Sequence, residues 1–119
     1  MAYAGARYAE STRKQGKVLS YMGVDQQTRR WVRVETWGGK LVENLVQAVA
    51  RDILRDKMLA LNALGYDIRA HVHDEVIISV PWQEVGSERV SAIMGAELPW
   101  THGLPLSAES YECEYYQKD

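Results

Sequence analysis

The densest group of chemically active side chains in the sequence lies at residues 71–75, which read His-Val-His-Asp-Glu. Two carboxylates, Asp74 and Glu75, are adjacent there, and His73 precedes them. Such oxygen ligands suit a hard divalent cation such as Mg²⁺, which is often held by one or two carboxylates together with waters and substrate phosphates. The residue types therefore favour metal-assisted phosphoryl-type chemistry at Asp74 and Glu75.

The same stretch contains a second pattern, because His71 and His73 form an H-x-H pair. On a strand, two residues at this spacing project to the same side and could bind zinc together with a carboxylate. A metal-dependent hydrolase is therefore a rival enzyme class. His102 is the only other histidine and lies in a distant loop, so we interpret His71 as a strand residue and give the rival less weight.

A β-hairpin is the element that must position these side chains. Residues 68–72 and 76–80 are rich in valine and isoleucine, which favours strands, and the polar cluster between them has the length of a tight turn. Two-residue hairpin turns prefer Asn-Gly or Asp-Gly, which tolerate positive φ angles. A turn at His73 and Asp74 is therefore expected to be strained or bulged, as functional tips often are.

Upstream of the hairpin, the sequence predicts one long helix over residues 38–64, with Gly65 as its left-handed C-terminal cap. Apolar residues such as Leu41, Leu45 and Val49 recur with a period near 3.6 and form a wide stripe. A helix of this length extends roughly 37 Å. It is the scaffold on which the hairpin is expected to pack.

Polar side chains recur along the same helix at near-helical spacing. They are Lys40, Asn44, Gln47, Arg51 and Arg55. The first four could share a face that points away from the core and reaches a nucleic-acid duplex. The alternative is an ordinary solvated helix face, which such rows usually are.

The remaining segments complete an expected α+β fold in a single domain of residues 1–119. We predict a short helix over residues 2–13 and two strands, residues 17–22 and 30–35, joined as a hairpin. After the central hairpin we predict a helix over residues 83–95, a loop rich in proline and glycine over 98–105, and a final strand over 106–116. The long helix would pack on an antiparallel sheet that includes the central hairpin.

Composition limits the classes of protein that the chain can represent. A hydrophobic fraction of 46% and a charged fraction of 25% are ordinary for a globular protein, and no apolar run approaches the roughly 20 residues of a membrane span. No signal peptide is visible, and the single Cys113 predicts a reducing cytoplasm. Residues 1–57 carry 11 basic and 6 acidic side chains, whereas residues 58–119 carry 3 and 10. A basic half could face phosphates while an acidic half holds metal.

Two stretches resemble a known family. His73-Asp74-Glu75 between apolar strands resembles the third conserved motif of the palm of family A DNA polymerases, and the bacteriophage branch is the most similar. Residues 38–54, Gly-Gly-Lys-Leu-Val-Glu-Asn-Leu-Val-Gln-Ala-Val-Ala-Arg-Asp-Ile-Leu, resemble the helix that precedes that hairpin in the same polymerases. The resemblance covers residues 18–116 and implies a partial palm. The implied reaction of the parent enzyme is template-directed nucleotidyl transfer with two metal ions.

The resemblance also implies roles for individual residues. Asp74 matches one of the two metal-binding aspartates, Glu75 matches the neighbouring auxiliary carboxylate, and His73 matches a residue that touches the primer terminus. Gln47 matches a helix residue that contacts the minor groove of the primer-template. We expect Lys40 and Arg51 to reach the duplex from the same side of the helix.

The chain departs from the family pattern in two respects. The family's other metal-binding aspartate, in a D-Y-S-type motif, and its R-x-x-x-K fingers helix have no counterpart here; Asp25 is the only early candidate and its context differs. Many members have an asparagine four residues before the glutamine, whereas Glu43 stands there and Asn44 lies three before. At 119 residues, the chain is also too short for a complete polymerase with palm, fingers and thumb.

The sequence thus predicts a fragment of a phage or prophage DNA polymerase. Its expected partners are primer-template DNA and deoxynucleoside triphosphates, with the rest of a split polymerase or a second copy of the chain as further candidates. We expect the isolated chain not to polymerise. The alternative is a non-catalytic prophage remnant that acts as a DNA-binding or self-associating module.

Overall fold

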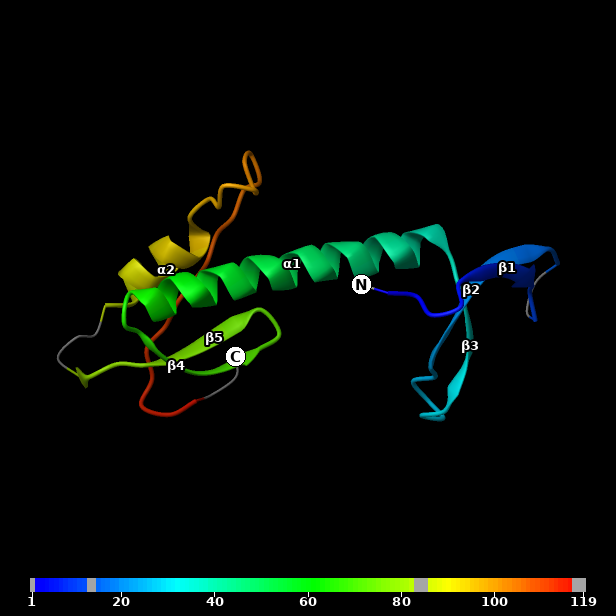
Figure 1. Cartoon of the computed structure of the whole chain (residues 1–119). Helices are drawn as coiled ribbons and strands as arrows, with labels where there is room; N and C mark the ends of the chain where they lie inside the picture. The colour runs from blue at the N-terminus through cyan, green and yellow to red at the C-terminus, as the bar shows by residue number, and fades with distance from the viewer. Residues whose placement is uncertain (1, 13–14, 83–85, 117–119) are drawn as a thin grey trace. The chain divides into compact units, whose positions relative to one another are not determined.

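The structure is a computed structural model and describes residues 2–12, 15–82 and 86–116. Its elements, labelled in Figure 1, are β1 (Arg7–Glu10), β2 (Lys17–Val24), β3 (Trp31–Thr36), α1 (Gly38–Ala63), β4 (Asp67–Val72), β5 (Glu75–Ser79) and α2 (Ser87–Gly95). The predicted α+β class is confirmed. The chain divides into two compact units, Met1–Ala48 and Val49–Asp119. That the chain is a single domain stays a prediction.

The long helix α1 matches its prediction closely, since it runs from Gly38 to Ala63. Gly65 adopts the left-handed conformation, with φ of 88°. The backbone N–H of Tyr66 donates to the carbonyl of Leu61 at 3.1 Å, and that of Gly65 donates to Asn62 at 3.0 Å. This pair of bonds is a Schellman motif, which satisfies carbonyls at the helix end and stops the helix sharply.

The first unit contains a three-stranded antiparallel sheet in the order β1-β2-β3. Strands β2 and β3 and their connection were predicted, and Asp25 holds that connection by accepting hydrogen bonds from the backbone of Gln27 and Thr28. Ser20 on β2 is 1% exposed, and its hydroxyl donates to the carbonyl of Arg7 at 3.2 Å. This side-chain bond ties the outer strand to the centre of the sheet.

The helix predicted over residues 2–13 is wrong, because residues 7–10 form strand β1 instead. Residue 13 lies outside the described residues. Tyr8 pairs with Leu19 and Ala9 with Val18 in antiparallel register. Apolar and polar residues alternate only weakly in β1, so its local sequence does not specify a strand. Pairing with β2 determines its extended conformation instead.

The strands form two sheets rather than one. The second is the two-stranded hairpin β4-β5, which belongs to the second unit. That unit also contains the C-terminal half of α1, where Leu54, Lys57 and Leu61 are buried at 6%, 2% and 0% exposure. Their spacing of three and four residues places all three on one side of the helix. Neither helix in the described part of the chain has the length and apolar character that a membrane span requires.

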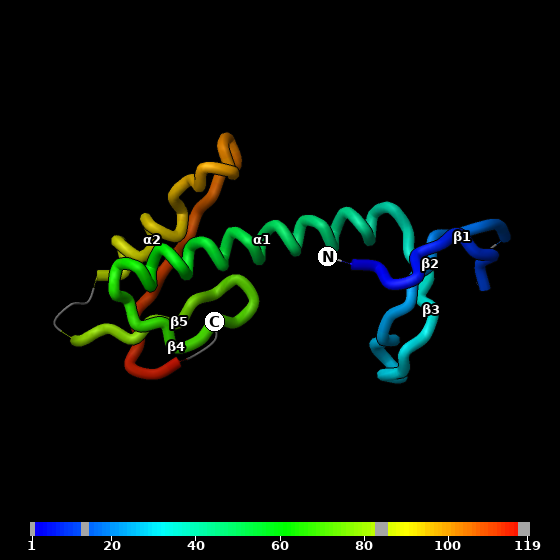
Figure 2. The backbone as a smooth tube through the Cα atoms, viewed as in Figure 1, coloured from blue at the N-terminus to red at the C-terminus, as the bar shows by residue number. Residues whose placement is uncertain are grey.

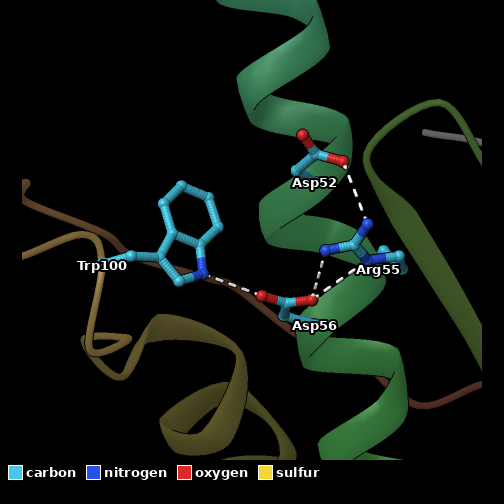
Figure 3. Close-up of polar contacts among 4 residues, drawn as sticks. All are labelled: Asp52, Arg55, Asp56 and Trp100. Atoms are coloured by element: carbon cyan, nitrogen blue, oxygen red, sulfur yellow. Dashed lines mark hydrogen bonds and ion pairs between the residues drawn. The ribbon is translucent and has the colours of Figure 1, made fainter.

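A polar network attaches the loop after α2 to α1 (Figure 3). The indole Nε1 of Trp100 donates to Asp56 at 2.8 Å, and the guanidinium of Arg55 contacts the other oxygen of Asp56 at 2.9 Å. Arg55 also lies 3.4 Å from Asp52. The hydrogen bond from Trp100, followed by that from Arg55, lowers the pKa of the Asp56 carboxyl.

The strand predicted over residues 106–116 is wrong as well. This segment follows α2 in the chain and is drawn orange to red in Figure 2. Its side chains bind α2: Ser110 donates to the carbonyl of Ser87 at 3.0 Å, and Glu112 accepts from the N–H of Ser87 at 3.1 Å. The helix predicted over residues 83–95 is confirmed as α2 from Ser87 onward, and residues 83–85 lie outside the described residues.

Lys57 provides a test of the second unit's packing. Its ammonium group donates to the carbonyl of Ala96, the C-cap residue of α2. A cation is favourable there because the C-terminus of a helix carries partial negative charge. Burial nevertheless lowers the pKa of Lys57 below its ordinary value of 10.5. Between the lowered pKa and about 10.5, the unfolded chain therefore binds more protons than the folded one.

We expect the free energy of unfolding to rise with pH across that window in the wild-type chain. Lys57→Met should abolish this rise, whereas Lys17→Met, which removes an exposed lysine of β2, should retain it. Urea unfolding at a series of pH values up to 10.5 measures the slopes. Equal slopes in wild type and Lys57→Met would contradict the assignment.

Candidate functional site

The predicted hairpin is present and places the three candidate residues at its tip. The strands β4 and β5 pair antiparallel, and Val72 opposite Glu75 is the last pair before the turn. His73 and Asp74 are therefore the two residues of the loop, and Glu75 opens β5. All three of these polar side chains are exposed.

The turn carries the expected strain. His73 has a φ of 54°, in the left-handed region that a residue with a Cβ enters at a cost of roughly 1–2 kcal/mol. Among the described residues other than glycine, only Arg29 shares this property. The register of the hairpin also shifts between Ile68 and Ala70, which marks a bulge. Both departures from an ideal hairpin lie in the element that carries the candidate residues.

A contact that the sequence did not reveal reaches Glu75 from the C-terminal segment. The hydroxyl of Tyr116 donates to a carboxylate oxygen of Glu75 at 3.4 Å. Burial, and then the negative charge of Glu75, raises the pKa of Tyr116. The prediction of a strand in this segment gave no reason to bring Tyr116 to the hairpin, and no motif marks it.

The described residues fit part of a magnesium site. Asp74 and Glu75 offer the one or two carboxylates that Mg²⁺ commonly takes from a protein. Within the described ranges, no group of three or more histidine, cysteine, aspartate or glutamate side chains could hold a metal ion. The zinc pair of the rival hypothesis is also altered, because His71 lies in β4 while His73 lies in the turn.

The polar row of α1 is partly occupied by local contacts. Lys40 forms an ion pair with Glu43 at 2.9 Å, and the amide of Asn44 donates to the hydroxyl of Tyr3 at 3.1 Å. Gln47 and Arg51 are exposed. Arg55 is engaged by Asp52 and Asp56, as described above. Gln47 and Arg51 are therefore the exposed members of the row that these local contacts leave unoccupied.

The candidate residues fall into two sets on different elements. His73, Asp74 and Glu75 are brought together at the hairpin tip in the second unit. Lys40 and Gln47 belong to the first unit, and Arg51 to the part of α1 in the second. Each set is exposed on a regular element, which suits contact with a large ligand.

Comparison with known proteins identifies a relative. No family model matches the chain, and no solved structure matches it. A protein named DNA polymerase, from Bacillus phage SP02, is 41% identical over all 119 residues. Along its whole length, the chain is similar to one segment of a phage DNA polymerase. It spans 18% of that relative's length.

The turn itself offers a test of whether His73 is retained for a reason other than stability. Glycine adopts positive φ without the steric penalty but loses more entropy on folding, so His73→Gly should raise the free energy of unfolding by roughly 0.5–1 kcal/mol. His71→Gly, in strand β4, should lower it. Thermal or urea unfolding measures both. Destabilisation by His73→Gly would show that the histidine side chain itself supports the turn.

Proposed function

We propose that this chain is part of the palm of a family A phage DNA polymerase. In this proposal the hairpin tip faces the metal ions and the primer terminus, while the polar row of α1 faces the duplex. The observation that carries the proposal is the 41% identity along the whole chain to a phage DNA polymerase. The position of His73-Asp74-Glu75 at the tip of a hairpin, as in the resembled motif, supports it.

Asp74 and Glu75 are the residues that would hold Mg²⁺. When bound, the metal ions of such polymerases lower the pKa of the primer hydroxyl and neutralise the triphosphate. Tyr116 donates only a long hydrogen bond, at 3.4 Å, to one oxygen of Glu75, so both carboxylates keep acceptor sites for a metal ion. The second aspartate and the nucleotide-binding helix would come from polymerase sequence outside these 119 residues.

Gln47 and Arg51 would contact DNA in different ways. A carboxamide both donates and accepts hydrogen bonds, so Gln47 can meet the acceptors that every base pair presents in the minor groove. Arg51 carries a guanidinium suited to backbone phosphates. A replicative enzyme needs contacts that are indifferent to sequence, and this pair supplies them.

The alternative function is a non-catalytic DNA-binding or self-associating module. It is favoured by the absence, among the described residues, of any cluster of three metal ligands. Both functions predict that the isolated chain does not catalyse polymerisation, because phosphoryl transfer depends on positioning by groups that are missing here. They differ in whether Asp74 binds metal at all.

We predict that Mn²⁺ or Mg²⁺ binds weakly at the hairpin tip. In an NMR titration, shifts or broadening should be confined to His73, Asp74 and Glu75, and Asp74→Asn should abolish them. One or two carboxylates leave most of an octahedral shell to water, so the affinity should be poor.

The matched control is Asp67→Asn, which removes an exposed carboxylate from β4 and should leave the titration unchanged. Primer extension with Mn²⁺ and four nucleotides should give no product. Robust extension that Asp74→Asn abolishes would contradict the fragment interpretation. A titration with no effect at the tip would favour the non-catalytic alternative.

We also predict weak, sequence-indifferent and salt-sensitive binding to duplex DNA. Arg51→Gln should weaken binding and reduce the slope of log affinity against log salt by about 1, because one phosphate contact is lost. Gln47→Ala should weaken binding without changing that slope. Fluorescence anisotropy at several salt concentrations measures both quantities.

The control for charge loss is Arg89→Gln, which neutralises an exposed arginine on α2. It should leave the slope unchanged. If Arg89→Gln and Arg51→Gln have equal effects, the binding is diffuse and the α1 row is not the DNA-binding face. Absence of binding at any salt concentration would count against duplex contact by the isolated chain.

A further inference from the structure

One side of α1 in the first unit presents apolar side chains to solvent. Val42, Leu45 and Val46 are 60%, 58% and 59% exposed. Their spacing of three and four residues places them on one face of the helix. Exposed apolar groups that are contiguous, rather than scattered singly, mark interaction surfaces.

A hollow of about 280 Å³ adjoins this face within the same unit. Its lining includes Leu41 and Leu45 from α1, Tyr21 from β2, and Thr36 at the end of β3. Thr36 is 6% exposed, and its Oγ1 has no hydrogen-bond partner within residues 2–12, 15–82 and 86–116. Buried polar groups are nearly always paired, so an unpaired hydroxyl beside the hollow is unusual.

The small number of buried apolar residues also indicates that apolar surface is exposed. In the described part of the chain, only Leu54 and Leu61 are buried apolar residues. Most large apolar side chains that the structure describes are therefore at least partly exposed.

We infer that Val42, Leu45 and Val46, together with the adjoining hollow, form a docking surface for a polymerase segment outside these 119 residues. We call it the α1 docking face. The expected occupant is an amphipathic helix that lays its apolar side along α1 and inserts one large side chain into the hollow. The inference rests on the proposed function. The related phage polymerase supplies the reason for this occupant, because the remaining 82% of its length lies outside the 18% that the chain matches.

The test measures binding of the 119-residue chain to the Bacillus phage SP02 polymerase from which the matching segment has been removed, once circular dichroism and a cooperative thermal transition have shown that the truncated polymerase is folded. Val46→Glu and Val42→Glu would each bury a charge in the contact, and each should weaken binding by about tenfold or more. Both positions are exposed in the isolated chain, so circular dichroism should show unchanged folding. Leu59→Glu is the matched control, because it also replaces an exposed apolar residue of α1 with glutamate, at 61% exposure. It should leave binding unchanged.

Three outcomes would overturn the α1 docking face. The first is no binding by the wild-type chain, and the second is an equal loss in Leu59→Glu and Val46→Glu. The third is a dimer of the chain alone, in analytical ultracentrifugation, that Val46→Glu dissociates, since the occupant would then be a second copy. Asp74→Asn should bind the truncated polymerase normally. The docking assay and the metal titration therefore test the two proposals separately, because the NMR titration measures metal binding at the hairpin tip without the truncated polymerase.

Discussion

The hydrogen bond from the N–H of Tyr66 to the carbonyl of Leu61 closes α1, and the organisation of the second unit depends on it. Gly65 makes the bond attainable because its φ of 88° would strain a residue with a Cβ. The chain leaves the helix there and enters β4 two residues later. Leu61, whose carbonyl accepts the bond, is also the most deeply buried apolar residue among those described. The end of the helix and the small core of this unit are therefore specified at one place.

The hairpin that follows combines antiparallel pairing, interrupted by one bulge, with a tip that is not optimised for stability. Asparagine or glycine would suit the position of His73 better, yet a histidine is held there at positive φ beside two exposed carboxylates. Tyr116 adds a hydrogen bond to Glu75 from far along the chain. Backbone strain of this kind clusters at functional sites, which agrees with the role that we propose for the tip.

Elements with a strong local signal were predictable from the sequence. The periodicity of α1, Gly65 and the valine-rich strands of the hairpin each specify their structure within a few residues. β1 and the C-terminal segment were not predictable, because distant partners decide them. Tyr8 is extended by pairing with Leu19, and residues around Ser110 bind α2 instead of a strand. For the candidate site, the sequence predicted the tip and its strain but not Tyr116, whose role depends on a contact 41 residues away.

The N-terminus of α2 shows how such distant contacts affect the order in which elements fold during synthesis. Gly86 occupies its N-cap position and has no side chain that could accept a hydrogen bond. The backbone N–H of Ser87 donates instead to the carboxylate of Glu112, 25 residues after Ser87. A nine-residue helix is marginal by itself in water. During synthesis, α2 must therefore wait for Ser110 and Glu112 to leave the ribosome before their side chains can bind its first turn.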